Sequence, residues 1–352
     1  METPSGSITG ILLIGALVAA GVWYSRDSAV HEVTHAGASH REESPAGFPS
    51  ASGRRVDWSA DGRSLLILSR NGADVQVQMT LHYLARPHEP TTVNLPGDVV
   101  SGASLAIDDH VLAATHEGRL WWIDSATGEP AILADLAEES AFTATAVAPG
   151  GRLVAAGTLT GAIYVCEPTA LPAIRLPTAR ASSITDLCFS DDGQFLLSAS
   201  GDGAVGLWNV KTLALVREFA GHQRSAMSAA FLRDNRQVIS VGLDDTTRIW
   251  NTETGSEEWR GEFGLGGVRT LAVTADGRTA VWGVFDQRFV VWDVERHQKT
   301  YEIRTAMPMV AHVRFSPDAT RLAVAGAERF VRIYEVRTGT QILEIPLDSP
   351  VR

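Results

Sequence analysis

A repeat of 42 residues is the feature of this chain that most restricts its fold. Dipeptides of an aromatic and a polar residue recur with this spacing, at Trp208-Asn209, Trp250-Asn251, Trp292-Asp293 and Tyr334-Glu335, and Cys166-Glu167 falls one period upstream. Apolar residues keep a second register at Val147, Phe189, Phe231, Val273 and Phe315, and aspartates keep a third at Asp192, Asp234, Asp276 and Asp318. A fixed period of this length indicates that one supersecondary unit is copied along the chain.

Each copy has the pattern of four short β-strands. Runs of β-branched or alternating apolar residues are separated by turn signals such as Asp192-Gly193, Asp276-Gly277 and Thr254-Gly255. At about 5–6 residues per strand, one period accommodates four strands and their turns. A single four-stranded sheet leaves both faces uncovered, so successive units must stack face to face, and a closed ring leaves no terminal sheet exposed. The period therefore predicts an all-β propeller.

The copies resemble the repeat of the WD40 family. The clearest copy runs from Ile184 to His222, ITDLCFSDDGQFLLSASGDGAVGLWNVKTLALVREFAGH, and the Trp-Asp dipeptide itself is present as Trp292-Asp293. A weaker copy surrounds Ile123-Asp124, and another begins at Trp58, with its Trp-Asp position placed at Tyr83. Seven units fit between about Val56 and Leu347. The resemblance implies a seven-bladed WD40-like β-propeller over residues 55–349.

Members of this family often brace a blade with a buried hydrogen-bond network of His, Asp, Ser and Trp, because buried polar groups must satisfy one another. The resemblance implies that one blade keeps all four members, the blade before it three, and the blade after it two. The residues are His222, Ser240, Asp244 and Trp250; then Ser198, Asp202 and Trp208; then Asp286 and Trp292. The alternative is a Ser-His-Asp catalytic triad, which we disfavour because the spacing of these residues coincides with the repeat register.

Other patterns of chemical groups point to no reaction. Gly201 to Gly206 reads G-x-G-x-x-G, but it lies between two expected strands with no helix to follow, so we interpret it as a hairpin. No P-loop, H-E-x-x-H, G-x-S-x-G or EF-hand pattern is present. Cys166 and Cys188 lie in apolar runs and are interpreted as small buried side chains. The sequence predicts no catalytic residue, no cofactor and no metal site.

The last unit carries a prediction about ring closure. Thr340 to Leu347 can supply the fourth strand of the last blade from its own repeat. We therefore expect the first and last blades to meet by face packing alone, which makes their junction the weakest in the ring. Pairing of residues 44–54 with the last blade would contradict this.

The N-terminal residues differ in composition from the repeats. After a tail of residues 1–7, residues 8–24 read ITGILLIGALVAAGVWY without a charge, which is just long enough for a transmembrane helix. The alternative is a cleaved signal peptide ending near Val18-Ala19-Ala20, although no Lys or Arg precedes the apolar run. Residues 25–54 are polar and small, as expected of a flexible linker, and His31, His35 and His40 within it are interpreted as solvated side chains.

The charge distribution bears on partners and on orientation. The net charge is −11, only Lys211 and Lys299 are lysines, and no basic run is present, which disfavours a nucleic-acid partner. Arg26 and Arg41 follow the apolar segment, and this bias weakly favours a propeller on the cytoplasmic side of a membrane; secretion after signal cleavage is the alternative.

In WD40-like rings, the loops from each outer strand to the next blade and the loops between second and third strands share one face, and similar proteins often bind partners there. By register this face should carry apolar and aromatic side chains beside an arginine, a composition typical of interfaces. The residues are Met227, Leu243, Arg269, Phe285, Met309 and His116. Scattered exposed apolar residues are also normal on protein surfaces, so the nomination rests on position.

The resemblance favours a membrane-tethered scaffold that binds other proteins through this face. An enzyme or a small-ligand sensor with a site in the central channel is the alternative, since some propellers build such sites from residues scattered along the chain. A third alternative is a structural subunit of a larger envelope or secretion assembly.

Overall fold

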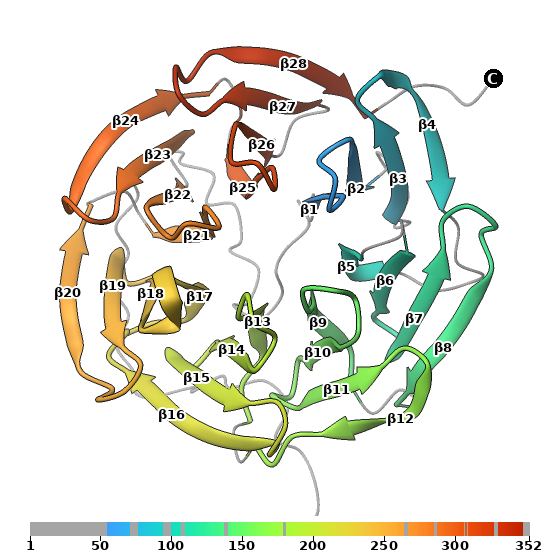
Figure 1. Cartoon of the computed structure of the whole chain (residues 1–352), viewed down its shortest axis with the longest axis horizontal. Helices are drawn as coiled ribbons and strands as arrows, with labels where there is room; N and C mark the ends of the chain where they lie inside the picture. Colours follow the sequence, from blue (N-terminus) through green and yellow to red (C-terminus); the bar gives the residue numbers. More distant parts are fainter. Residues whose placement is uncertain are drawn as a thin grey trace, which may run out of the picture. The chain divides into compact units, whose positions relative to one another are not determined.

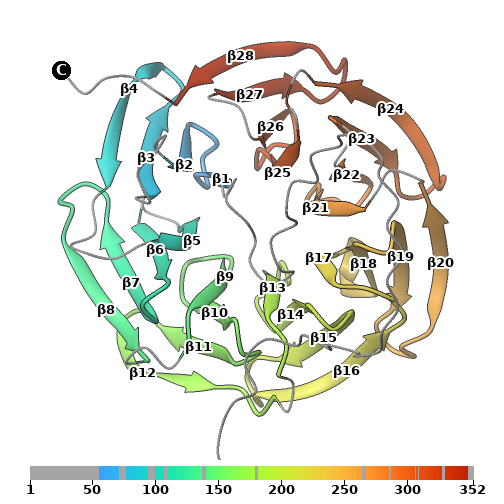
Figure 2. The ribbon, with the colours of Figure 1, turned by 180° about the vertical axis from the view of Figure 1, so that it is seen from behind.

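The computed structural model describes residues 55–70, 77–93, 100–106, 110–136, 140–178, 181–263, 267–284, 287–305, 307, 309–326 and 330–347. Over these residues the chain forms 28 strands in seven antiparallel sheets of four, arranged in a ring around a central axis (Figure 1). Each sheet is one blade of four consecutive strands, with its first strand nearest the axis and its fourth at the rim (Figure 2). The predicted seven-bladed all-β propeller is confirmed.

The first four blades have the following strand bounds. Blade 1 is β1 (Arg55–Trp58), β2 (Ser64–Arg70), β3 (Val77–Tyr83) and β4 (Arg86–Val93). Blade 2 is β5 (Val100–Leu105), β6 (His110–Thr115), β7 (Arg119–Asp124) and β8 (Pro130–Asp135). Blade 3 is β9 (Phe142–Val147), β10 (Val154–Thr158), β11 (Ile163–Glu167) and β12 (Ala170–Arg175). Blade 4 is β13 (Ile184–Phe189), β14 (Phe195–Ser200), β15 (Ala204–Asn209) and β16 (Ala214–Ala220).

The remaining three blades complete the ring. Blade 5 is β17 (Ala226–Phe231), β18 (Gln237–Gly242), β19 (Thr246–Asn251) and β20 (Glu257–Glu262), with the short 3₁₀ turn η2 (Arg233–Asn235) between its first two strands. Blade 6 is β21 (Val268–Val273), β22 (Thr279–Val284), β23 (Arg288–Asp293) and β24 (Gln298–Arg304). Blade 7 is β25 (Val310–Phe315), β26 (Arg321–Gly326), β27 (Phe330–Glu335) and β28 (Gln341–Pro346).

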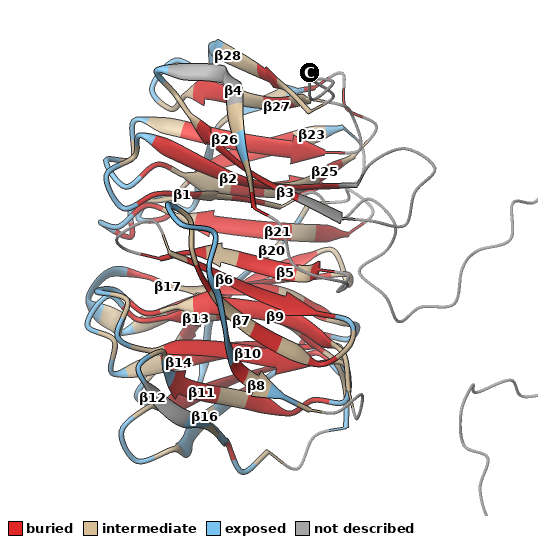
Figure 3. Ribbon diagram, turned by 90° about the vertical axis from the view of Figure 1, so that its right-hand side faces the viewer, coloured by how far each residue is buried: buried red, intermediate tan, exposed pale blue. Residues whose placement is uncertain are grey.

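The hydrophobic core is divided among the junctions between neighbouring blades. Seven clusters of buried apolar residues occur, and each takes its members from two adjacent blades. At the junction of blades 4 and 5, for example, Leu197 and Phe219 pack with Ala229 and Trp250. Buried residues fill the inner strands, while the outermost strands carry many of the exposed ones (Figure 3). Stacking of sheet faces is therefore what buries the apolar residues of each copied unit.

The turn from first to second strand is stabilised by a repeated polar contact. In blades 1, 4, 6 and 7 a Ser or Thr hydroxyl donates to an aspartate two residues later, at 2.6 Å in each case: Ser59–Asp61, Ser190–Asp192, Thr274–Asp276 and Ser316–Asp318. The same aspartate accepts a backbone N–H two residues further on. In blade 5 the residue in this register, Asp234, instead has a left-handed backbone, with φ at 59°. The aspartates that recur every 42 residues in the sequence therefore serve mainly to stabilise the turn between the first and second strands.

Blade 7 supplies its own fourth strand, as predicted, whereas residues 44–54, whose pairing would contradict the rest of the closure prediction, lie outside the described residues. Blade 7 takes β28 from its own repeat, and no strand from outside blade 7 joins its sheet among the described residues. Blades 1 and 7 meet through a shared cluster that includes Val56, Trp58, Ala325 and Val331. The Trp58 indole N–H also donates to the Arg314 carbonyl across this junction, at 3.1 Å.

The first blade requires a correction at its third strand. Leu65 pairs with His82 in blade 1, as Leu196 pairs with Trp208 in blade 4. The residue in register with the repeat tryptophan is therefore His82, and Tyr83 occupies the following, polar position. His82 is buried and its Nε2 lies 3.0 Å from the Thr80 hydroxyl, so a local contact stands where blades 4 to 6 have the indole.

The N-terminal predictions concern residues outside the described part of the chain. The tail of residues 1–7, the apolar segment 8–24 and the linker 25–54 all precede the first described residue. No helix in the described ranges combines the length and apolar character needed to cross a bilayer.

Candidate interaction face and its supporting network

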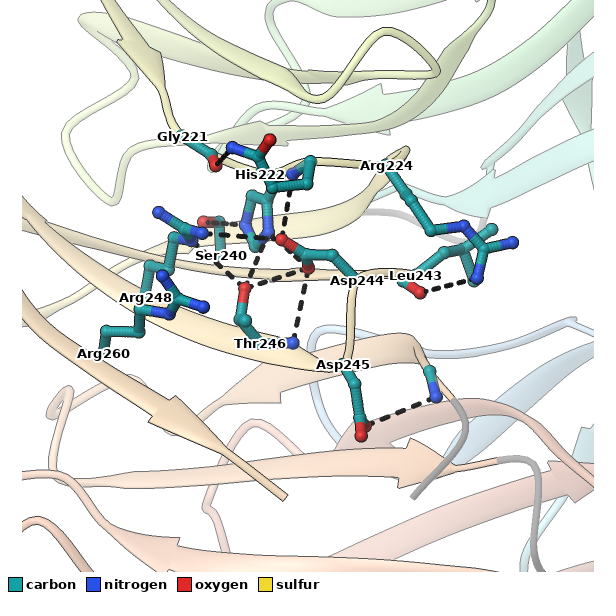
Figure 4. Close-up of polar contacts among 12 residues, drawn as sticks. Gly221, His222, Arg224, Ser240, Leu243, Asp244, Asp245, Thr246, Arg248 and Arg260 are labelled. Atoms are coloured by element: carbon teal, nitrogen blue, oxygen red, sulfur yellow. Dashed lines mark hydrogen bonds and ion pairs between the residues drawn. The ribbon is translucent and has the colours of Figure 1, made fainter. Parts of the chain in front are cut away.

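The four residues predicted to brace blade 5 are brought together in the structure, and Figure 4 shows three of them, His222, Ser240 and Asp244. His222 Nε2 lies 2.8 Å from the Ser240 hydroxyl, and His222 Nδ1 lies 2.9 Å from Asp244 Oδ1. The Trp250 indole N–H donates to the same Ser240 oxygen at 2.8 Å. Ser240 is fully buried, so a substrate has no access to its hydroxyl. This geometry suits a brace joining β18 and β19 to the segment before β17.

The network extends to residues that the sequence pattern did not single out. The Thr246 hydroxyl donates to Asp244 Oδ1 at 2.9 Å, and Arg248 Nε donates to the Thr246 hydroxyl at 3.1 Å. Arg248 then reaches Glu257 Oε2 on β20 at 2.6 Å. The network therefore runs from the second strand of blade 5 to its outermost strand.

Burial and hydrogen bonding set the protonation of this network. Burial lowers the pKa of His222 from its ordinary value, against the opposing hydrogen bond to Asp244. Burial would raise the pKa of Asp244, but its hydrogen bonds with His222, Gln223 and Thr246 outweigh that effect and hold the pKa at about 2. At neutral pH the pair is thus a neutral imidazole beside an ionised carboxylate.

The neighbouring blades keep only parts of this arrangement. In blade 4 the Trp208 indole N–H donates to Ser198 at 2.9 Å, while Asp202 is exposed and accepts the Ala204 N–H at 3.1 Å. In blade 6 the serine position is taken by Trp282, which pairs across β22 and β23 as Ser240 does in blade 5. The Trp282 and Trp292 rings lie 5.5 Å apart, and both indole N–H groups are buried without a partner. Asp286 lies outside the described residues.

The first strands of blades 2 to 7 share a β-bulge at their second residue. A bulge redirects the side chain that it carries. We call the residues at this position the bulge residues: Ser101, Thr143, Thr185, Met227, Arg269 and Ala311.

In blades 2 to 4 the bulge residue is a hydroxyl that joins one blade to the next. Ser101 donates to the Phe142 carbonyl at 2.5 Å, Thr143 to the Ile184 carbonyl at 2.6 Å, and Thr185 to the Ala226 carbonyl at 2.6 Å. The acceptor is in each case 41 residues further along the chain. A hydroxyl repeated every 42 residues is visible in the sequence, but the bulge that gives it this role is not.

In blades 5 and 6 the same position carries long side chains. Met227 and Arg269 are both half-buried. Arg269 donates to the sulfur of Met309, which stands just before β25, at 3.2 Å. Two residues nominated from the sequence, on different blades, are therefore in contact.

The other nominated residues lie in loops at the same ends of the blades. Ala226 pairs with Gly242, which places Leu243 beside the start of β17, and the Arg224 side chain donates to the Leu243 carbonyl at 3.1 Å. His116 is exposed in the corresponding loop of blade 2. Phe285 lies outside the described residues. We call the surface formed by Met227, Leu243, Arg269 and Met309 the loop face.

Comparison with known families agrees with the strand geometry. The model of the WD domain, G-beta repeat family (WD40) matches residues 174–209 and 213–251, which contain most of blades 4 and 5. These are the blades that keep three and four members of the bracing set. The chain is a seven-bladed β-propeller with WD40 repeats in blades 4 and 5. No match to it is found among curated proteins.

Charged residues on the inner strands of the propeller join the first strands of different blades. Arg55 donates to the Thr143 carbonyl at 3.1 Å, and Asp57 accepts the Leu105 N–H at 3.0 Å. Asp186 accepts a hydrogen bond from Ser228 of the next blade. Burial raises the pKa of Asp57, and burial lowers the pKa of His312 well below its ordinary value. Within the described ranges no three His, Cys, Asp or Glu side chains are grouped as a metal site would require.

A cavity of about 210 Å³ opens where the inner strands of blades 4 to 7 end. Asp186 and Arg314 contribute to its lining, together with Phe189, Phe231 and Phe315 from the apolar register of the repeat. Cys188 also lines it, and burial raises the pKa of its thiol to about 12, so the sulfur stays protonated and unreactive. Cys166 is buried in blade 3, where burial raises its pKa to about 11.

Proposed function

We propose that this WD40 propeller is a protein-binding scaffold whose contact surface is the loop face of blades 5 to 7. The observation that carries the proposal is the change of residue type at one structural position. Where blades 2 to 4 use a short hydroxyl to join neighbouring blades, blades 5 and 6 carry Met227 and Arg269. The short hydroxyl is replaced there by longer side chains of the kinds that are enriched at protein interfaces.

The network beneath the loop face supports the same proposal. His222, Asp244 and Thr246 hold the segment before β17 against the loop after β18, and that loop carries Leu243. A partner would therefore meet side chains whose backbone is fixed before binding, which lowers the entropy cost of association.

We further propose that residues 8–24 anchor the propeller to a membrane, with residues 25–54 as the tether. The apolar length and the aromatic residues Trp23 and Tyr24 support an anchor. A flexible tether of this length has a root-mean-square span of about 30 Å. Flotation with liposomes tests the anchor: the full chain should float, and a chain of residues 55–352 should not. Flotation of the shorter chain to the same extent would refute it.

The test of the loop face uses two variants with the same change of charge. Arg269→Glu combined with Met309→Ala alters the loop face, and Arg233→Glu alters an exposed residue in the turn at the opposite ends of the strands. Proximity labelling from the propeller in the cells that make it would identify neighbours, and pull-down would compare their capture. We expect at least a tenfold loss for the double variant and less than a twofold change for Arg233→Glu. Equal capture by all forms refutes the loop face as the contact surface.

The cavity at the carboxyl ends of the inner strands favours a small-ligand sensor as a second candidate. It combines aromatic walls with Asp186 and Arg314, which suits a small polar ligand carrying an apolar group. Asp186→Asn should then abolish ligand-induced thermal stabilisation in a metabolite screen. A screen without any stabilising compound would remove this candidate.

A further inference from the structure

A second cleft, of about 300 Å³, lies on blade 4 where that blade faces blade 3. Its walls are mostly apolar and include Ile163, Ile184, Trp208 and Leu215. Ser198 and Ser200 supply hydroxyls to the lining. The cleft is separate from the loop face, so its role does not depend on the proposed scaffold function.

Blade 5 explains why the cleft exists. Ser198 pairs with Gly206 in blade 4, and Ser240 pairs with Arg248 in the same register of blade 5. Trp208 pairs with Leu215, and Trp250 pairs with Glu257. In blade 5 the space beside the indole is therefore filled by the Arg248–Glu257 ion pair, whereas blade 4 has a glycine and a leucine in those two positions.

Glycine at position 206 brings its backbone close to the buried indole and hydroxyl of blade 4, since a Cβ there would lie 2.8 Å from Trp208 Nε1 and 2.9 Å from Ser198 Oγ. Ala204, also in the lining, replaces Thr246 of blade 5. At these described positions Ala204, Gly206 and Leu215 thus replace the larger polar side chains Thr246, Arg248 and Glu257 of blade 5, and the cleft lies beside them.

The lining contains a polar group without a partner. Ser200 Oγ is buried and makes no hydrogen bond. Its register position in blade 5 is Gly242, where a Cβ would come within 2.6 Å of His222 Nδ1. A side chain at this position therefore points into the space that the imidazole ring of His222 fills in blade 5. In blade 4 the corresponding residue, Arg180, lies outside the described residues.

The geometry points to a binding site for one neutral aromatic ring that carries a single hydroxyl, the phenol class of ligand. An apolar cavity of about 150 Å³ already holds a benzene ring, so this cleft has room for the ring and its substituent. The mostly apolar walls, with the exposed carboxylate of Glu218 as the charged group in the lining, disfavour an anionic ligand, because its charge would be desolvated there without a counter-charge. The ligand hydroxyl would satisfy Ser200, whose buried Oγ otherwise remains unpaired.

Phenol and toluene are the probes, because they differ only by a hydroxyl in place of a methyl group. The indole N–H resonance of Trp208, assigned with Trp208→Phe, reports occupancy in the full chain. We expect phenol to shift it saturably at millimolar concentration, with at least fivefold tighter binding than toluene. Ser200→Ala should reduce this preference to about one.

Ser69→Ala is the matched control, since Ser69 holds the same register in blade 1 and should leave the preference unchanged. If Ser200→Ala does not fold, Ala204→Leu fills the cleft from its wall and should abolish binding of both probes. An unmoved Trp208 resonance, or the same phenol preference with and without the Ser200 hydroxyl, overturns the assignment.

One more probe separates the two sources of such a ring. N-acetyl-tyrosinamide presents the phenol as a protein side chain would. Binding at least as tight as that of phenol assigns the site to a partner's tyrosine, and binding more than tenfold weaker assigns it to a free small molecule; both results support the phenol site.

Discussion

The Ser240 hydroxyl illustrates how one small side chain can organise a blade. It lies within hydrogen-bond distance of both His222 Nε2 and Trp250 Nε1, and all of these groups are buried. In blade 4, Ser198 accepts a hydrogen bond from the Trp208 indole, and the position of the bracing histidine lies outside the described residues. We expect Ser240→Ala to lower the free energy of unfolding by about 2–4 kcal/mol and Ser198→Ala by about 1–2 kcal/mol, because each stranded buried group costs about 1–3 kcal/mol. Urea denaturation of the two variants measures the difference, and equal losses would contradict the central role of Ser240.

The protonation of His222 and Asp244 predicts sensitivity to acid. His222 has a pKa below its ordinary value of 6.5, so the unfolded chain binds the proton more readily, and stability falls as the pH drops below about 6.5. Asp244 has a pKa of about 2, so its contribution is present above about pH 4 and is lost as the pH falls from there toward 2.

The measurement is the free energy of unfolding between pH 7 and 5. The wild-type chain should lose stability over this range, and His222→Gln should lose less, with the effect of buried His312 remaining in both. An identical slope in the variant would show that His222 is not held neutral.

Sequence register located the bracing residues but not everything around them. His222, Ser240, Asp244 and Trp250 follow from the repeat, because the repeat brings equivalent positions to equivalent places. Thr246 and Arg248 join the network through the rotamers that they adopt, and these have no signature in a single sequence. Trp282 occupies the position of the bracing serine in blade 6. Only the structure shows that the indole N–H groups of Trp282 and Trp292 are then left without a hydrogen-bond partner.

At the scale of strands, the bulge at the second residue of the inner strand links stability to recognition. A threonine at this position donates to the next blade, as Thr185 does to the Ala226 carbonyl. Met227→Thr should therefore install the missing hydrogen bond toward blade 6. We expect a stability within about 1 kcal/mol of wild type, because the new hydrogen bond offsets the lost methionine packing.

The same variant should reduce partner capture in pull-down, because the apolar side chain is removed from the loop face. Thr143→Val is the converse control: it should lower the free energy of unfolding by about 1–2 kcal/mol without affecting capture. If Met227→Thr captures partners as well as the wild type does, the bulge residue of blade 5 does not contribute to partner binding.

The order of the strands could be predicted from the sequence. Their pairing register was predicted correctly in some blades but not in blade 1. Turn signals and the 42-residue period defined most units, since each strand is short and each turn has its own chemistry. The first blade lacks the repeat tryptophan, and the prediction chose the aromatic Tyr83 although three periods of 42 residues counted back from Trp208 fall on His82. The pairing with Leu65 assigns the position to His82. The bulges cannot be recognised in the sequence, because residues as different as Ser, Met and Arg occupy them.

At the scale of the whole ring, the junction of blades 7 and 1 differs from the other six in one respect. Every other pair of neighbouring blades is joined by the chain itself, whereas this pair is held by side-chain contacts, with no strand shared between the two sheets in the described part of the chain. Opening the ring here breaks no covalent link, so this junction should have the lowest local opening free energy. Amides of β1 and β25 should therefore exchange hydrogen faster than those of β9 and β13.

Two tryptophans provide a matched test of this junction. The Trp58 indole donates across it to the Arg314 carbonyl at 3.1 Å, whereas the Trp208 indole donates within blade 4 to Ser198 at 2.9 Å. Each Trp→Phe variant loses one indole hydrogen bond, worth about 0.5–1.5 kcal/mol. Trp58→Phe should then speed exchange in β1 and β25 by about twofold to tenfold, while Trp208→Phe should leave these strands unchanged. If both variants accelerate amide hydrogen exchange in all inner strands alike, the ring opens as one cooperative unit. The junction of blades 7 and 1 is then no weaker than the other junctions.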